Sequence, residues 1–193
     1  MKLAIVGTHS TGKTTLISTL AKAFESQGKR VVIVPEMARL CPFPINEGTT
    51  AEAQKWILEK QISEENSFDD SEAVVICDRA TIDNFAYFFR HCAQFKPEED
   101  LAPWEALAVD HASTYDAIFK TQKLAIAAEA DGDRAVGEVF RQEMDDIITR
   151  LLEKYSIPHI LLPATTDYAA HVAFITEYLH GRDAINRVST NFS

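Results

Sequence analysis

Short apolar runs alternate with longer stretches of helical pattern along the 193 residues of this chain. In the longer stretches, apolar side chains recur at helical intervals, as Leu16, Leu20 and Phe24 do between residues 13 and 27. Strands and helices that alternate in this way predict a three-layer α/β fold around a parallel sheet. The five runs that we expect to be strands are 3–6, 31–34, 73–77, 117–120 and 158–162.

Glycines, prolines and capping residues set the limits of the expected helices. Gly28 should end the first helix, and three prolines between residues 35 and 48 predict a loop. Thr49 and Glu52 stand at capping-box spacing, so the next helix should begin near Thr50. Further helices are expected over 80–94, 104–111, 137–155 and 168–179.

Two further expectations concern burial and domain limits. The run 31–34 is β-branched throughout, which favours a strand buried on both faces. The chain has the usual size of one domain, and its last residues are polar. We therefore expect a single domain over residues 1–180 and a polar tail over 181–193.

The segment between the first expected strand and the first helix has the pattern G-x-x-x-x-G-K-[ST]. Its glycines let successive backbone N–H groups point at phosphate oxygens, Lys13 can reach the β- and γ-phosphates, and the Thr14 hydroxyl can join a Mg²⁺ shell. The alternative is a glycine turn before an ordinary helix, and the strand–loop–helix setting argues against it. The predicted nucleotide-binding residues are Gly7, Thr8, His9, Ser10, Thr11, Gly12, Lys13, Thr14 and Thr15.

Charged residues follow the second and third expected strands directly. Ligands of open parallel sheets bind beyond the carboxyl ends of the strands, so these residues are candidates for chemistry. Asp78 could hold Mg²⁺ together with Thr14, Arg79 could contact the phosphates or the acceptor, and Glu36 could orient an acceptor hydroxyl. The alternatives are a surface ion pair for Asp78 and Arg79, and a helix N-cap or loop ion pair for Glu36.

A lid is expected over residues 121–141, between the fourth strand and the following helix. Arg134 and Arg141 are seven residues apart, share a face if both are helical, and could balance charge on the transferred group. Solvated residues at a helix start are the alternative. Gln61 could contact a substrate base or be an exposed helix residue, and the pair Glu64 and Glu65 suggests a solvated face.

The amino-acid composition argues against some classes of binding partner for this chain. The formal net charge of −10 argues against an extended nucleic-acid surface, although one nucleotide pocket is compatible with it. Cys41, Cys77 and Cys92 lack the spacing of metal ligands, and an odd number of cysteines favours reduced thiols and a cytoplasmic location. The first apolar run is too short for a membrane span or a signal peptide.

With these motifs the chain resembles the P-loop nucleoside and nucleotide kinases, and most of all the ATP-binding proteins related to ribosylnicotinamide kinase that are often labelled AAA. The resemblance rests on residues 7–15, on Pro35-Glu36-Met37-Ala38-Arg39, on Cys77-Asp78-Arg79, and on Asp131-Gly132-Asp133-Arg134 with Phe140-Arg141. It implies a parallel sheet in the order 2-3-1-4-5 and transfer of the γ-phosphate of ATP to a small acceptor.

The acceptor stays open at this point. Deoxynucleoside kinases usually have Glu-Arg-Ser where Asp78-Arg79-Ala80 stands here, and the Asn-Lys-x-Asp guanine motif is missing. We therefore expect an ATP- and Mg²⁺-dependent kinase that acts on a nucleoside, a nucleotide or a related ribosyl compound. The alternative is a regulatory or assembly ATPase without a small-molecule acceptor. The oligomeric state is open, with a homodimer as one option.

Overall fold

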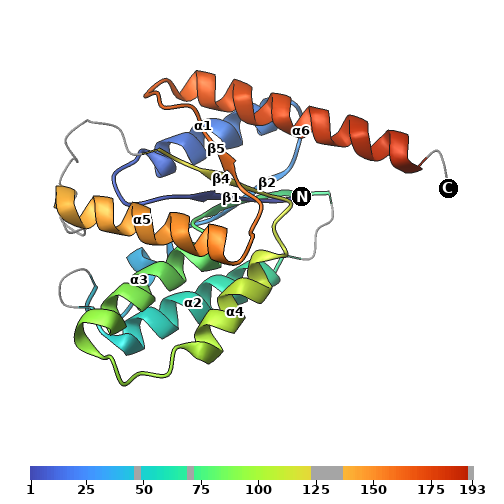
Figure 1. Ribbon diagram of the computed structural model, residues 1–193. Helices are drawn as coiled ribbons and strands as arrows, with labels where there is room; N and C mark the ends of the chain where they lie inside the picture. Colours follow the sequence, from blue (N-terminus) through green and yellow to red (C-terminus); the bar gives the residue numbers. More distant parts are fainter. Residues whose placement is uncertain (46–48, 69–71, 123–136, 191–193) are drawn as a thin grey trace.

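Five parallel strands form one sheet in the order β2-β3-β1-β4-β5. The computed structural model describes residues 1–45, 49–68, 72–122 and 137–190 (Figure 1). The predicted sheet and its strand order are confirmed, and β1 lies at the centre, between β3 and β4. The strands are β1 (Lys2–Val6), β2 (Val31–Val34), β3 (Val74–Asp78), β4 (Ala117–Lys120) and β5 (Ile160–Leu161).

Helices cover both faces of the sheet, which gives the three layers that the sequence predicts. One face carries α1 (Lys13–Ser26) and α6 (Tyr168–Thr190), which lie above the sheet in Figure 1. The opposite face carries the other four helices, and the short 3-10 helix η1 (Met37–Leu40) follows β2. These four are α2 (Ala51–Asn66), α3 (Thr81–Phe95), α4 (Ala102–Ala112) and α5 (Glu138–Lys154).

Alternate residues of the central strand supply two separate hydrophobic cores. Leu3 and Ile5 pack with the cluster under α1 and α6, whereas Ala4 and Val6 pack with the cluster under α2 to α5. This alternation follows from the two-residue period of a strand. Burial of each large aliphatic side chain stabilises the folded protein by about 1.5–3 kcal/mol. Because β1 contributes side chains to both clusters, this strand links the two layers of helices.

Three sequence expectations differ from the structure at the ends and edges of elements. Because β2 is an edge strand, it is not buried on both faces, and Ile33 is 45% exposed. The cap of α2 is Thr50 rather than Thr49, since its side chain accepts a hydrogen bond from the Ala53 N–H. The last helix continues to Thr190, because residues 180–190 contain one glycine and no proline to stop it.

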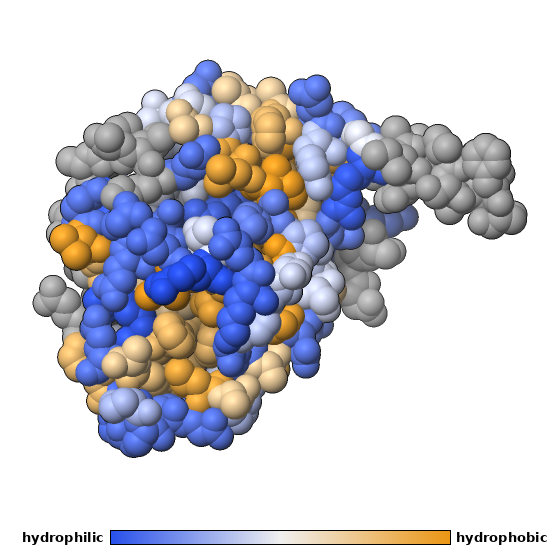
Figure 2. Space-filling model, in the orientation of Figure 1, coloured by the Kyte–Doolittle hydropathy of each residue, from blue (hydrophilic) through white to orange (hydrophobic). Residues whose placement is uncertain are grey.

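The parallel arrangement brings the carboxyl ends of β1, β2 and β3 to the same edge of the sheet, where α1, η1 and α3 begin. The surface in the same orientation is mixed, with hydrophobic residues gathered both over the lower helices and in the upper part of the view (Figure 2). Within the described part of the chain, no helix has both the length and the apolar character that a bilayer crossing requires.

Candidate functional site

The loop between β1 and α1 has a backbone that suits the close approach of an anion. Gly7 and Gly12 have φ of 137° and 78°, and Ser10 has φ of 56°. A side chain at Gly7 would lie 2.2 Å from Thr121 Oγ1, and one at Gly12 would lie 2.4 Å from Tyr168 OH. The N-cap residue of α1 is Gly12, which has no side chain to cap the first N–H groups of the helix, and such N–H groups suit the binding of an anion.

Lys13 is a buried cation whose ammonium group lies on the loop itself. Its Nζ donates to the carbonyl oxygens of Gly7, at 2.9 Å, and Thr8, at 2.6 Å. Burial and, next, the repulsion of Arg79 lower the pKa of Lys13 from 10.5 to about 8. Neutral carbonyl groups therefore do not fully replace the water that the ammonium group has lost, and an anion would stabilise its charge.

The other loop residues lie against β4 and α5. Thr11 Oγ1 donates to the Thr8 carbonyl at 3.0 Å and lies 2.8 Å from Thr121 Oγ1. The His9 ring packs on Phe140 of α5, with the centroids 5.4 Å apart. Thr14 and Thr15 are exposed at the start of α1, Ser10 is half-buried, and Thr8 is buried.

Thr14 and Asp78 meet at the carboxyl end of β3. The Thr14 hydroxyl donates to Asp78 Oδ2 at 2.9 Å. Asp78 Oδ1 is buried and has no hydrogen-bond partner among the described residues. Burial raises the pKa of Asp78, Lys13 opposes that change, and the Glu36 carboxylate adds to it. A hydroxyl and an unsatisfied carboxylate oxygen fit the oxygen ligands that Mg²⁺ takes together with water and phosphate.

Arg79 lies between two carboxylates. Its Nε donates to Glu36 Oε1 at 2.8 Å, and its Nη1 donates to Asp83 Oδ1 at 2.7 Å. Both ion pairs are buried. Arg79 also has φ of 87°, a left-handed conformation that costs a non-glycine residue about 1–3 kcal/mol. The surrounding contacts therefore hold this residue in place against a local strain.

Sequence reasoning left Asp83 outside the site, but the structure includes it. Asp83 Oδ2 accepts a hydrogen bond from the Gly7 N–H at 3.0 Å, so this carboxylate joins the phosphate loop to Arg79. The available signal was its position one helical turn after Arg79 on α3. Glu36 has a second arginine partner, because Arg39 Nε donates to Glu36 Oε2 at 3.2 Å.

The predicted lid is only partly described. Arg134 lies within residues 123–136, outside the described residues. Arg141 is buried in the first turn of α5, where its Nη1 donates to Glu138 Oε2 at 3.2 Å. Phe140, its neighbour, contacts His9, so the start of α5 lies beside the phosphate loop.

Gln61, interpreted as a base contact or an exposed residue, and Glu65, expected on a solvated face, are both buried in α2. Gln61 is completely buried, and its Nε2 donates to Glu65 Oε1 at 2.6 Å and to the Arg79 carbonyl at 3.3 Å. Its amide nitrogen therefore serves internal contacts, whereas its Oε1 is buried and has no hydrogen-bond partner among the described residues. Glu65 is also buried, which corrects the expectation of a solvated face, because α2 turns this side toward α4 and the sheet.

Solved structures with a similar fold include a deoxyadenosine kinase and the NadR protein. The deoxyadenosine kinase from M. mycoides, solved with dCMP and dCDP bound, has a TM-score of 0.65 at 17% identity over 94% of this chain and 100% of its own. The NadR protein in complex with NR has a TM-score of 0.69 at 21% identity over 92% of this chain and 51% of its own. At such identities the likeness establishes the fold.

A second NadR structure, in complex with NAD and AMP-PNP, has a TM-score of 0.66 at 19% identity and matches 92% of this chain. The present chain spans about half the length of the NadR chains. No curated protein sequence matches it. A family model described as an AAA domain matches residues 2–170. Since that match covers most of the chain, and the fold is that of the P-loop kinases expected from the sequence, this protein belongs to the AAA domain family.

Proposed function

We propose that the protein transfers the γ-phosphate of ATP to a hydroxyl group of a nucleoside, a nucleotide or a related ribosyl compound. The observation that carries this proposal is the convergence of three groups at one edge of the sheet. These are the Lys13 ammonium on the phosphate loop, the Thr14–Asp78 pair, and the Glu36–Arg79–Asp83 ion cluster. The first two suit a triphosphate and Mg²⁺, and the third suits a second substrate.

On the ATP side, the loop N–H groups and Lys13 would bind the β- and γ-phosphates. Lys13 would exchange the Gly7 and Thr8 carbonyl oxygens for phosphate oxygens, which are better partners for a buried cation. Thr14 and Asp78 would hold Mg²⁺, which when bound neutralises charge on the phosphate oxygens.

On the acceptor side, Glu36 would orient the hydroxyl group and accept its proton. Glu36 accepts hydrogen bonds from Arg79 and Arg39, and a carboxylate oxygen can accept more than one hydrogen bond. Glu36 need not be a strong base for this role, because the acceptor proton leaves late in a loose phosphoryl-transfer transition state. Arg79 would stabilise charge on the transferred group, with Arg134 and Arg141 as additional candidates from the lid.

The acceptor class is supported by the named neighbours. One is a deoxyadenosine kinase, and another was solved with NAD and AMP-PNP, so nucleosides and related ribosyl compounds are the first acceptors to test. We include a cytoplasmic location in the proposal, as the three cysteines suggest. The oligomeric state is left to measurement.

A screen with γ-labelled ATP tests the proposal. The protein is incubated with Mg²⁺ and with nucleosides, nucleotides and vitamin ribosides in turn, and the products are separated. Label on an acceptor supports the kinase. Label released only as inorganic phosphate across the whole panel would overturn it in favour of a regulatory ATPase. Asp78→Asn is the control, because it keeps the fold contact with Thr14 but weakens the predicted Mg²⁺ site.

A further inference from the structure

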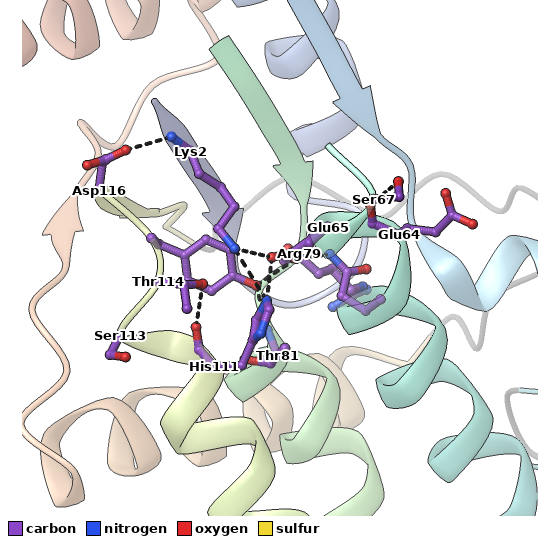
Figure 3. A network of polar contacts seen from close by, with 12 residues as sticks. Lys2, Glu64, Glu65, Ser67, Arg79, Thr81, His111, Ser113, Thr114 and Asp116 are labelled. Carbon is purple, nitrogen blue, oxygen red and sulfur yellow. Dashed lines mark hydrogen bonds and ion pairs between the residues drawn. The ribbon is translucent and has the colours of Figure 1, made fainter. Parts of the chain in front are cut away.

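Glu65 is a buried carboxylate at which four side chains meet. Lys2 Nζ lies 3.0 Å from Oε2, and His111 Nε2 lies 2.8 Å from the same oxygen (Figure 3). Gln61 Nε2 and the Tyr115 hydroxyl donate to Oε1 at 2.6 and 2.7 Å. Burial alone would raise the pKa of Glu65, but the hydrogen bonds from His111, Gln61 and Tyr115 lower it below its ordinary value.

Two of these partners continue from Glu65 to the turn between β3 and α3. Gln61 Nε2 also donates to the Arg79 carbonyl at 3.3 Å. The Tyr115 hydroxyl accepts a hydrogen bond from the Thr81 N–H at 3.1 Å. Arg79 and Thr81 are the residues on either side of Ala80, so both ends of this short turn are linked to the same carboxylate.

The turn held in this way includes one of the few non-glycine residues of the described chain with a positive φ. It contains Arg79 in its left-handed conformation, and it follows Asp78 directly. The Arg79 side chain is held by Glu36 and Asp83, but these contacts fix the guanidinium group rather than the backbone. The links through Gln61 and Tyr115 act on the backbone itself.

We propose that Glu65 is a positioning residue that fixes the backbone of the Asp78–Arg79 turn through Gln61 and Tyr115, and so sets the point from which the Arg79 side chain reaches Glu36 and Asp83 in the site. This inference rests on the proposed function for its effect on catalysis, but its geometric part does not. None of the three residues needs to touch a substrate. A purely structural role would instead stabilise α2 and α4 without any specific effect on Arg79.

Tyr115→Phe is the sharpest variant, because it removes one oxygen and keeps the ring. It takes away the acceptor of the Thr81 N–H and one donor to Glu65. Tyr155→Phe is the matched control, because the Tyr155 hydroxyl also bonds a glutamate, Glu105, and neither residue is hydrogen-bonded to the turn in the described part of the chain. Gln61→Met is a second variant that removes both Gln61 links with little change in side-chain volume.

Hydrogen exchange of the Arg79 Nε–H, followed by nuclear magnetic resonance in the nucleotide-free protein, is the first readout. We expect this proton to exchange about tenfold faster in Tyr115→Phe and in Gln61→Met, and at the wild-type rate in Tyr155→Phe. The Arg90 Nε–H, which donates to Glu143 Oε2 at 2.8 Å, is the internal reference for general loosening. Equal acceleration at both arginines, or no acceleration at Arg79, would overturn the proposal.

Turnover is the second readout, with the acceptor found by the labelled-ATP screen. Tyr115→Phe and Gln61→Met should lower kcat about tenfold while the KM for ATP changes by less than about twofold. In an Arg79→Met background, Tyr115→Phe should have no further effect on kcat. Additive losses would contradict a route through Arg79. If no acceptor exists but the exchange result holds, the kinase proposal fails and the positioning of Arg79 stands.

Discussion

The phosphate loop and the ion cluster at the end of β3 each bury a cation, but they treat it in opposite ways. Lys13 in the loop is bonded to carbonyl oxygens, and burial followed by repulsion from Arg79 lowers its pKa to about 8. For Arg79 burial also acts against the charge, yet Asp83, Tyr87 and Glu36 hold its pKa well above the ordinary value. The Lys13 ammonium group is hydrogen-bonded to carbonyl oxygens, and the carboxylates of Asp83, Asp78 and Glu36 only partly offset its loss of water. The Arg79 guanidinium group is paired directly with two carboxylates.

The two regions therefore differ in the group that neutralises the buried cation. The loop is electrostatically unfinished until an anion binds, so its cation should matter for ligand binding and turnover more than for folding. The cluster is complete in the free protein, so removal of any member leaves another charge buried and unpaired. A substitution of Lys13 should therefore change turnover without lowering stability, whereas a substitution of Arg79 should lower both.

Lys13→Met should show the largest effect. It removes the charge aimed at the phosphates, and we expect turnover to fall by about 10³-fold or more. The melting temperature of the nucleotide-free protein should stay the same or rise, because burial of the charged lysine is unfavourable. Both are measured on one preparation, with Lys22→Met, at an exposed position of α1, as the control. A variant that melts lower and keeps its turnover would reverse our view of the loop.

Asp83→Asn should act on both properties. It breaks the buried pair with Arg79 and weakens the acceptor of the Gly7 N–H, and we expect the free energy of unfolding to fall by about 3 kcal/mol. Denaturant titration measures the loss, and turnover should decline with it. Asp110→Asn, at an exposed position of α4, is the control. If stability is unchanged, the cluster is not the neutralised unit that we describe.

The same contrast explains what the sequence could predict. The phosphate loop is a continuous segment whose function depends on its own backbone, so residues 7–15 and the setting of Lys13 could be recognised directly. Asp83 and Glu65 were left out of the predicted site because their contacts with Gly7 and Lys2, respectively, join residues that are far apart along the chain. A charged residue on a helix looks the same in the sequence whether it is solvated or forms a buried pair.

The exposure of residues on the edge strand could not be predicted from the sequence, for a similar reason. The strand order follows from the family resemblance and was correct, but the exposure of Ile33 depends on β2 having a neighbour on one side only. Periodicity reports which side chains share a face, not whether a second strand or helix covers that face. The limits of α1, α3 and β4 were predicted closely, because local stop signals set them.

Glu36→Gln tests whether a change on the acceptor side of the site can lower turnover without weakening ATP binding. The amide keeps an oxygen for one arginine but cannot accept a proton, so turnover should fall by about 10²-fold with ATP affinity nearly intact. Steady-state kinetics and equilibrium binding of ATP measure the two quantities. A loss of ATP affinity with turnover preserved would show that Glu36 belongs to the ATP side.

The pH dependence of stability gives the smallest effect and the most direct test of the Lys13 electrostatics. Below pH 8 Lys13 is charged in both the folded and the unfolded chain, and the unfavourable burial is fully present. Between about pH 8 and its unfolded value of 10.5 the folded protein loses this proton first, so the unfolded chain binds more protons and stability rises with pH.

The measured quantity is the free energy of unfolding of the wild type minus that of Lys13→Met, with a chelator present and no nucleotide. Groups that titrate alike in the two proteins cancel in this difference. With a folded pKa of about 8, the difference should move in favour of the wild type by about 1 kcal/mol between pH 7 and pH 9. A flat difference would mean that the loop carbonyls solvate the ammonium group as well as water does, and the loop would then be as complete without an anion as the Arg79 cluster is.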